Sequence, residues 1–225
     1  MLAFSSLLGN VEGQNIYRIW YDKPASYWEE ALPVGNGRIA AMVFGDPQLE
    51  QIQLNEETVS AGSPYQNYNE EAKTALPEMR RLIFEGKYEE AQNMAATKIL
   101  SQVGNEMPYQ TVGRLNIRYQ DHKKVNNYYR DLDISNAVAV TRYEVDGVEF
   151  TEETFASFTD QLVIRHIKAS KPGTINCELF FNTPMRDPKR SIYGKKGLRL
   201  EGITHGSRYF PGKVHYCADL DVKHK

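Results

Sequence analysis

The feature that most constrains the fold is a period-two alternation of apolar and polar residues in the second half of the chain. Residues 115–119 alternate in this way, and so do residues 142–145 and 148–151. Between the last two runs lie Asp146 and Gly147. Asp-Gly between alternating runs favours a type I′ turn, because both central residues of that turn need a positive φ. The pattern therefore predicts an antiparallel hairpin.

Further strands are predicted at similar spacing, with Gly- and Pro-rich turns between them. They cover residues 16–20, 38–44, 50–54, 137–145, 161–169, 174–182, 198–203 and 213–222. Residues 24–37 and 60–69 carry the punctuation typical of loops. Many short strands with regular turn signals indicate a β-sandwich or barrel.

One segment changes to a helical period. Apolar residues recur at helical spacing around Leu82, and Pro77 suits a first helical position. Gly86 is expected to end this helix, and residues 87–100 are expected to form a second one. The predicted fold is mostly β: a large antiparallel β-sandwich with a short two-helix insertion near residues 70–100.

Charge and composition exclude several classes of protein. The chain has 225 residues and a formal net charge of −2, which gives no electrostatic footprint for nucleic acid. Its longest apolar run, residues 39–44, is far shorter than the roughly 20 residues that span a bilayer. Cys177 and Cys217 are too few for a disulfide scaffold or a zinc site. The sequence leaves open whether these two cysteines are bonded to each other.

The two ends of the chain also carry expectations. Residues 1–8 resemble the back half of a secretory h-region, without a basic segment before it. Residues 1–14 are therefore expected to be a signal-peptide remnant or a disordered tail. Residues 15–225 are expected to be one β-sandwich domain, truncated at its C-terminal end because residues 213–222 alternate like a strand in mid-sheet.

A dinucleotide-binding fingerprint, G-x-G-x-x-A, starts at Gly35 and ends at Ala40. Its context does not fit, because Pro33 interrupts a preceding strand and Gly45 ends the segment before a helix can form. A structural turn is the better interpretation.

The sequence pattern gives little support for a catalytic acid–base pair or for a metal site. The paired carboxylates at Glu29, Glu56 and Glu152, each with its acidic neighbour, cannot act as couples, because adjacent strand residues point to opposite faces. Solvated surface is the expectation for each pair. The five histidines have no metal-ligand spacing, so we expect no metal. His166 is expected to be structural or exposed.

One set of residues gathers aromatic rings, amides and charges of the kind that hold sugars. Rings can cover the apolar face of a sugar, while amides and carboxyls bind its hydroxyls. The same mixture fits a domain interface. The candidates for either role are Trp28, Asn36, Arg38, Asn55, Glu56 and Tyr65.

The order of motifs resembles the N-terminal part of glycoside hydrolase family 95. The similar segments are WYDKPA (20–25), EALPVGNGRI (30–39), AMVFG (41–45), IQLNE (52–56), LIFEGKYEEA (82–91), YRDLD (129–133) and FAS (155–157), with Trp28, Tyr109, Gln110 and Gly113. The family consists chiefly of α-L-fucosidases, with some α-L-galactosidases.

The resemblance implies a super-β-sandwich that packs on a downstream (α/α)6 catalytic barrel. It also implies an inverting hydrolase that removes α-1,2-linked fucose from oligosaccharides, with no metal or cofactor and with its catalytic residues in the barrel. We therefore expect no catalytic residue here and a bacterial, periplasmic or secreted enzyme. A stand-alone carbohydrate-binding module and a purely structural interaction domain are the alternatives.

The sequence departs from the family pattern in three places. Ser60 stands where the family usually has Trp, Arg114 where it has Asp, and Ala40 where Gly is common. The loss of the aromatic ring at Ser60 puts the identity of the substrate in question.

Overall fold

The computed structural model describes residues 17–62, 67–101, 108–206 and 211–224. The chain divides into two compact units. The first comprises Met1–Glu57 and Gly113–Asn182, and the second comprises Thr58–Val112 and Thr183–Lys225. The predicted tail at residues 1–14 and the candidate Tyr65 lie outside the described residues.

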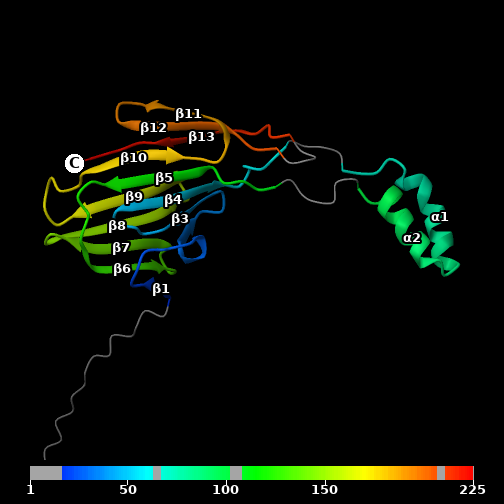
Figure 1. Cartoon of the computed structure of the whole chain (residues 1–225), viewed down its shortest axis with the longest axis horizontal. Helices are drawn as coiled ribbons and strands as arrows, with labels where there is room; N and C mark the ends of the chain where they lie inside the picture. Colours follow the sequence, from blue (N-terminus) through cyan, green and yellow to red (C-terminus); the bar gives the residue numbers. More distant parts are fainter. Residues whose placement is uncertain (1–16, 63–66, 102–107, 207–210, 225) are drawn as a thin grey trace, which may run out of the picture. The chain divides into compact units, whose positions relative to one another are not determined.

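The first unit contains two five-stranded antiparallel sheets (Figure 1). The first sheet has the order β1-β6-β7-β8-β9, with β1 Arg18–Tyr21, β6 Val125–Asp133, β7 Val138–Val145, β8 Val148–Ser157 and β9 Leu162–Ala169. The second has the order β10-β5-β4-β3-β2, with β10 Cys177–Asn182, β5 Gly113–Tyr119, β4 Leu49–Glu56, β3 Ile39–Val43 and β2 Leu32–Gly35. The prediction of a mostly β, antiparallel sandwich is confirmed.

The Asp-Gly hairpin forms as the sequence predicts. Asp146 and Gly147 have φ values of 48° and 72°, and they join β7 to β8. Tyr143 and Phe150, on either side of this turn, belong to a buried apolar cluster that also contains Val145 and Val148. The turn residues thus set the register that brings alternate side chains into the core.

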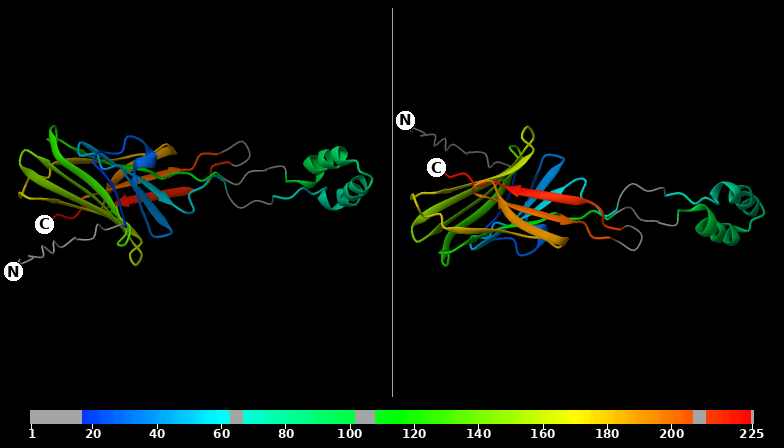
Figure 2. Two further views of the ribbon diagram at one scale, coloured as in Figure 1. Left: turned by 90° about the horizontal axis from the view of Figure 1, so that it is seen from below. Right: turned by 90° about the horizontal axis from the view of Figure 1, so that it is seen from above.

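The second unit contains a three-stranded antiparallel sheet and a helical hairpin. The sheet order is β11-β12-β13, with β11 Arg186–Tyr193, β12 Gly197–Ile203 and β13 His215–Leu220. The helices are α1 Ala72–Phe84 and α2 Tyr88–Met94, which lie side by side in both views of Figure 2. The second helix continues as a π-helical turn, Ala95–Ile99.

Helix α1 starts five residues before the predicted position, so Pro77 lies inside it. The earlier start follows from Asn69, whose Oδ1 accepts a hydrogen bond from the Glu71 N–H at 3.0 Å. The predicted end is confirmed. Gly86 has a φ of 73°, and the N–H of Lys87 donates to the Leu82 carbonyl at 2.9 Å, as in a Schellman motif.

The prediction of an uninterrupted loop over residues 24–37 is wrong, because β2 forms within it. β2 is an edge strand, where a proline is tolerated. The Asn36 N–H bonds to the Ile39 carbonyl at 3.1 Å. Because ladder bonds recur at every second residue, the nitrogen of Pro33 faces away from β3 and no bond is lost. No helix follows this turn, so the interpretation against a nucleotide fingerprint is confirmed.

Besides β2, two further strands have no counterpart in the sequence prediction. β6 carries a register shift between Asn126 and Tyr129, and β11 carries one between Arg186 and Lys189. Every residue of β11 is exposed, so no apolar face marks it in the sequence. Irregular pairing and solvent exposure both remove the period-two signal.

Both cysteines are free thiols: Cys177 is partly buried and Cys217 is exposed. His166 is exposed, and its Nδ1 lies 3.2 Å from Glu153 Oε2, which agrees with the expectation of a structural or exposed residue. In the described part of the chain, the helices are all too short or too polar to cross a membrane.

Candidate functional site

Four of the six candidate residues meet at one end of the β2-β3-β4 edge of the second sheet. Asn36 and Arg38 lie in the β2–β3 turn, and Asn55 and Glu56 are the last two residues of β4. Strand pairing places Ile39 opposite Glu56, and the N–H of Glu57 donates to the Arg38 carbonyl at 2.9 Å. We call Asn36, Arg38, Asn55 and Glu56 the strand-end cluster.

Asn36 shapes the turn. Its Oδ1 accepts hydrogen bonds from the N–H groups of Arg38 and Ile39 at 3.1 and 2.9 Å. Its Nδ2 donates to the Ser157 carbonyl of β8 at 2.8 Å, and the side chain is almost fully buried. Gly37, with a φ of 90°, completes the turn. Asn36 therefore positions Arg38 by fixing the backbone before it.

Arg38 and Glu56 form the charged part of the cluster. The Arg38 Nε lies 3.2 Å from the Glu56 Oε1, and the Arg38 side chain is exposed whereas Glu56 is mostly covered. An exposed guanidinium can donate to several hydroxyls or to a carboxylate. The cluster thus offers a binding surface. Its carboxylate is paired with Arg38, and hydrolysis with inversion needs two carboxyl groups on opposite sides of the scissile bond.

Asn55 points to the opposite face of β4 from Glu56, because successive strand residues alternate. Its Oδ1 is buried, and no hydrogen-bond donor reaches it from the described residues. A buried acceptor that stays unsatisfied costs about 1–3 kcal/mol. Asn55 therefore marks a place where an additional donor would be stabilising.

Trp28 is positioned by a different element, the short 3-10 helix η1 Trp28–Glu30. Its side chain is 47% exposed. The loop before and after it is held by Arg130 of β6, which donates to the carbonyls of Lys23 and Glu30 at 2.8 and 2.7 Å. Arg130 is fully buried over the ring of Tyr21, and burial lowers the pKa of its guanidinium. Sequence reasoning missed Arg130.

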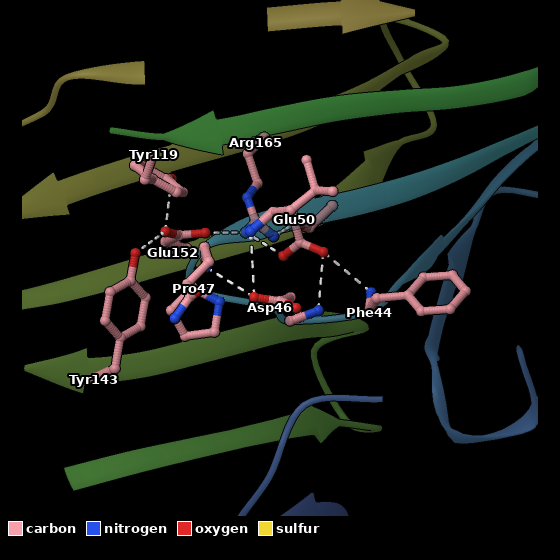
Figure 3. Close-up of polar contacts among 12 residues, drawn as sticks. Phe44, Asp46, Pro47, Glu50, Tyr119, Tyr143, Glu152 and Arg165 are labelled. Atoms are coloured by element: carbon pink, nitrogen blue, oxygen red, sulfur yellow. Dashed lines mark hydrogen bonds and ion pairs between the residues drawn. The ribbon is translucent and has the colours of Figure 1, made fainter. Parts of the chain in front are cut away.

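A second feature that sequence reasoning missed is a buried ionic network between the two sheets of the first unit (Figure 3). Arg165 of β9 pairs with Glu50 of β4 at 2.6 Å and with Glu152 of β8. Tyr119 and Tyr143 donate to Glu152 Oε1 at 2.7 and 2.6 Å. The expectation that Glu152 is solvated is therefore wrong: it lies on the inner face of β8.

The network is electrically unbalanced, since one guanidinium faces two carboxylates. Glu50 also accepts hydrogen bonds from the N–H groups of Phe44 and Gly45 at 3.2 and 2.8 Å. Burial, opposed by Arg165, raises the pKa of Glu50. Burial acts to lower the pKa of Arg165, but the two carboxylates outweigh it and the pKa is raised. These groups are enclosed, so we assign them to holding the sheets together.

The described residues contain no group of three or more His, Cys, Asp or Glu side chains that could hold a metal ion. The fold is an antiparallel β-sandwich, and the strand-end cluster is its candidate site. The chain belongs to the family described as "Glycosyl hydrolase family 65, N-terminal domain", whose model matches residues 19–224.

The chain is also similar to curated proteins of plants and fungi. It is 37% identical over 181 residues to "Alpha-L-fucosidase 2" of Arabidopsis thaliana, covering 78% of this chain and 21% of that protein. It is 26% identical over 162 residues to "Probable alpha-fucosidase A" of Aspergillus niger, covering 68% of this chain and 20% of that protein. The protein of the same name from Aspergillus oryzae is 25% identical over 211 residues, covering 88% and 28%.

The chain thus spans between a fifth and three tenths of the length of these relatives. Its sequence matches an N-terminal domain model of glycosyl hydrolases and is similar to part of proteins named for α-fucosidase activity. The matching model is named for family 65, so the resemblance to family 95 stays a prediction. A bacterial origin and secretion also stay predictions, since these relatives are eukaryotic.

Proposed function

We propose that this domain belongs to a family 95-type α-L-fucosidase that removes terminal α-1,2-linked fucose from oligosaccharides with inversion. The observation that carries the proposal is the 37% identity to a protein named for α-L-fucosidase activity. In this proposal a downstream helical domain supplies the general acid and the base that activates water. The β-sandwich domain packs on it and contributes no reacting group.

The strand-end cluster is the part of this domain that we assign to the mouth of the active site. Arg38 is exposed and held by Glu56, so its donors are presented in a fixed place. The Asn55 Oδ1 is buried on the opposite face of β4, so we assign the exposed contact at this end of the sheet to Arg38.

The proposal that the reacting groups lie outside this domain can be tested directly. The isolated 225-residue chain should release no L-fucose from 2′-fucosyllactose, whereas the longer protein that contains it should release fucose. Proton NMR of the early product should show the β-anomer, as inversion requires. Turnover by the isolated chain would contradict the division of labour. Absence of fucose release by the longer protein would contradict the proposed activity.

The role of Arg38 can be tested in the same longer protein. Arg38→Ala should lower kcat/KM for 2′-fucosyllactose by about tenfold, the loss of one charged hydrogen bond. Arg118→Ala is the matched control, because Arg118 is also exposed and pairs with Glu178 at 2.9 Å on β5 and β10. Equal kinetic effects of the two variants would contradict a site at the strand-end cluster.

A further inference from the structure

A pair of aromatic rings, one exposed and one partly buried, lies on the sheet of the first unit that does not carry the strand-end cluster. Trp20 belongs to the edge strand β1, and its side chain is 60% exposed. Its ring is nearly parallel to that of Tyr129 on β6, with an interplanar angle of 19° and centroids 6.3 Å apart. Rings at this distance are displaced sideways rather than fully overlapped, so aromatic surface stays open.

Charged side chains lie next to the two aromatic rings. Strand pairing places Trp20 directly opposite Asp131, which is fully buried. Arg18 and Arg142 flank this carboxylate, with nitrogen–oxygen distances of 2.9 and 3.6 Å. Both guanidinium groups are partly exposed, so each has donors that face solvent. Asp131 therefore holds two guanidinium groups, both hydrogen-bond donors, beside the aromatic rings.

The charges beside the rings balance. Arg18 also pairs with Asp133, at 3.3 Å, so two arginines meet two aspartates. A surface for an anionic ligand would carry excess positive charge. Flat aromatic surface bordered by neutralised donors and acceptors matches instead an uncharged ligand with one apolar face and a rim of hydroxyls.

We propose that Trp20 and Tyr129, with Arg18 and Arg142, form a second binding surface that takes a pyranose ring of a neutral oligosaccharide. The pyranose ring stacks on the indole of Trp20, and the hydroxyls of the sugar accept hydrogen bonds from the guanidinium groups of Arg18 and Arg142. This surface needs no hydrolytic step. It would hold a glycan on the β-sandwich whether or not the strand-end cluster contacts substrate.

The chain allows a direct test because Trp20 belongs to the proposed surface, whereas Trp28, its other tryptophan, lies on the short helix η1. Trp28→Phe leaves Trp20 as the single tryptophan, and Trp20→Phe leaves Trp28. Each variant of the 225-residue chain is titrated with 2′-fucosyllactose and, separately, with lactose while tryptophan fluorescence is followed. The proposal expects a saturable change in the Trp28→Phe variant.

Two further variants test the assigned roles. Tyr129→Ala should weaken binding about tenfold or more in the Trp28→Phe background, as loss of a stacking partner does. Arg142→Met should weaken binding while leaving the emission maximum of free Trp20 unchanged. Arg118→Met, which alters an exposed arginine of the other sheet, should leave binding unchanged.

Two outcomes would overturn the proposal. One is a Trp20 signal that does not saturate with either sugar, while circular dichroism reports a folded domain. The other is saturable binding that Tyr129→Ala and Arg142→Met leave unaltered. A response of Trp28 alone would place binding outside this surface and reject the proposal. The kinetics of Arg38→Ala test the strand-end cluster separately, so failures of the two proposals are distinguishable.

Discussion

Arg165→Met should lower the free energy of unfolding by about 3–5 kcal/mol, the usual cost of removing one partner of a buried ion pair. The variant leaves Glu50 and Glu152 buried without their guanidinium. Denaturant unfolding followed by circular dichroism measures the change. Arg118→Met is the matched control, since the Arg118 and Glu178 side chains are 51% and 52% exposed and such pairs contribute less than about 1 kcal/mol. Similar losses in both variants would contradict the assignment.

The loss in Arg165→Met should shrink as the pH is lowered. The folded-state pKa of Glu50 is already raised above its ordinary value of 4.5, so the folded protein takes up this proton before the unfolded chain does. Stability linked to Glu50 therefore rises as the pH falls through the raised pKa. Without Arg165 the pKa rises further, so recovery between pH 7 and about pH 5 should be larger in the variant.

The neighbours of Glu50 must be counted in this test. Glu152 also pairs with Arg165. Tyr119 and Tyr143 donate hydrogen bonds to Glu152. Burial lowers the pKa of His122, which destabilises the fold as the pH falls below the ordinary histidine value. That contribution has the opposite sign but is common to both proteins, so the difference between them isolates the carboxylates. A loss that stays constant with pH would contradict the prediction.

Gly45→Ala should be the second severe change. Gly45 has a φ of 75°, and an added Cβ would lie 2.8 Å from the Tyr128 hydroxyl and 2.9 Å from Arg130 Cδ. Left-handed backbone costs about 1–2 kcal/mol and overpacking about 1–3 kcal/mol, so we expect a loss of about 2–5 kcal/mol in the free energy of unfolding. Thermal and denaturant unfolding measure it.

Gly147→Ala separates the two causes. Gly147 has a similar φ of 72°, but an added Cβ there meets nothing within 4 Å. This control should show the backbone cost alone. If the two alanine variants lose the same stability, close packing around Gly45 contributes nothing and the explanation is wrong.

Local signals account for the parts of the fold that the sequence predicted. Asp146 and Gly147 fix a tight hairpin through their own backbone preferences, and Gly86 ends α1 in the same way. The boundaries that were wrong depend on partners. Pro33 is compatible with a strand only because that strand is at an edge, and the start of α1 depends on Asn69. β11 has no apolar face to reveal it.

The candidate site was predictable to the extent that its residues are close in the sequence. Asn36 and Arg38 belong to one turn, and pairing of adjacent strands brings Asn55 and Glu56 to them. The ionic network joins residues 115 positions apart, Glu50 and Arg165, and only the packing of two sheets makes them neighbours. A sequence signal does exist: Glu50 shares its strand face with Ile52 and Leu54, where a charge requires a buried partner.

The proline of β2 also bears on how this domain behaves at high concentration. An edge strand presents free N–H and carbonyl groups that can template a strand from another molecule. The outward-facing nitrogen of Pro33 carries no hydrogen, so an added strand would lose a bond in the middle of β2. Polymerisation through this edge is thereby disfavoured, which keeps the exposed Arg38 of the neighbouring turn accessible in a crowded solution.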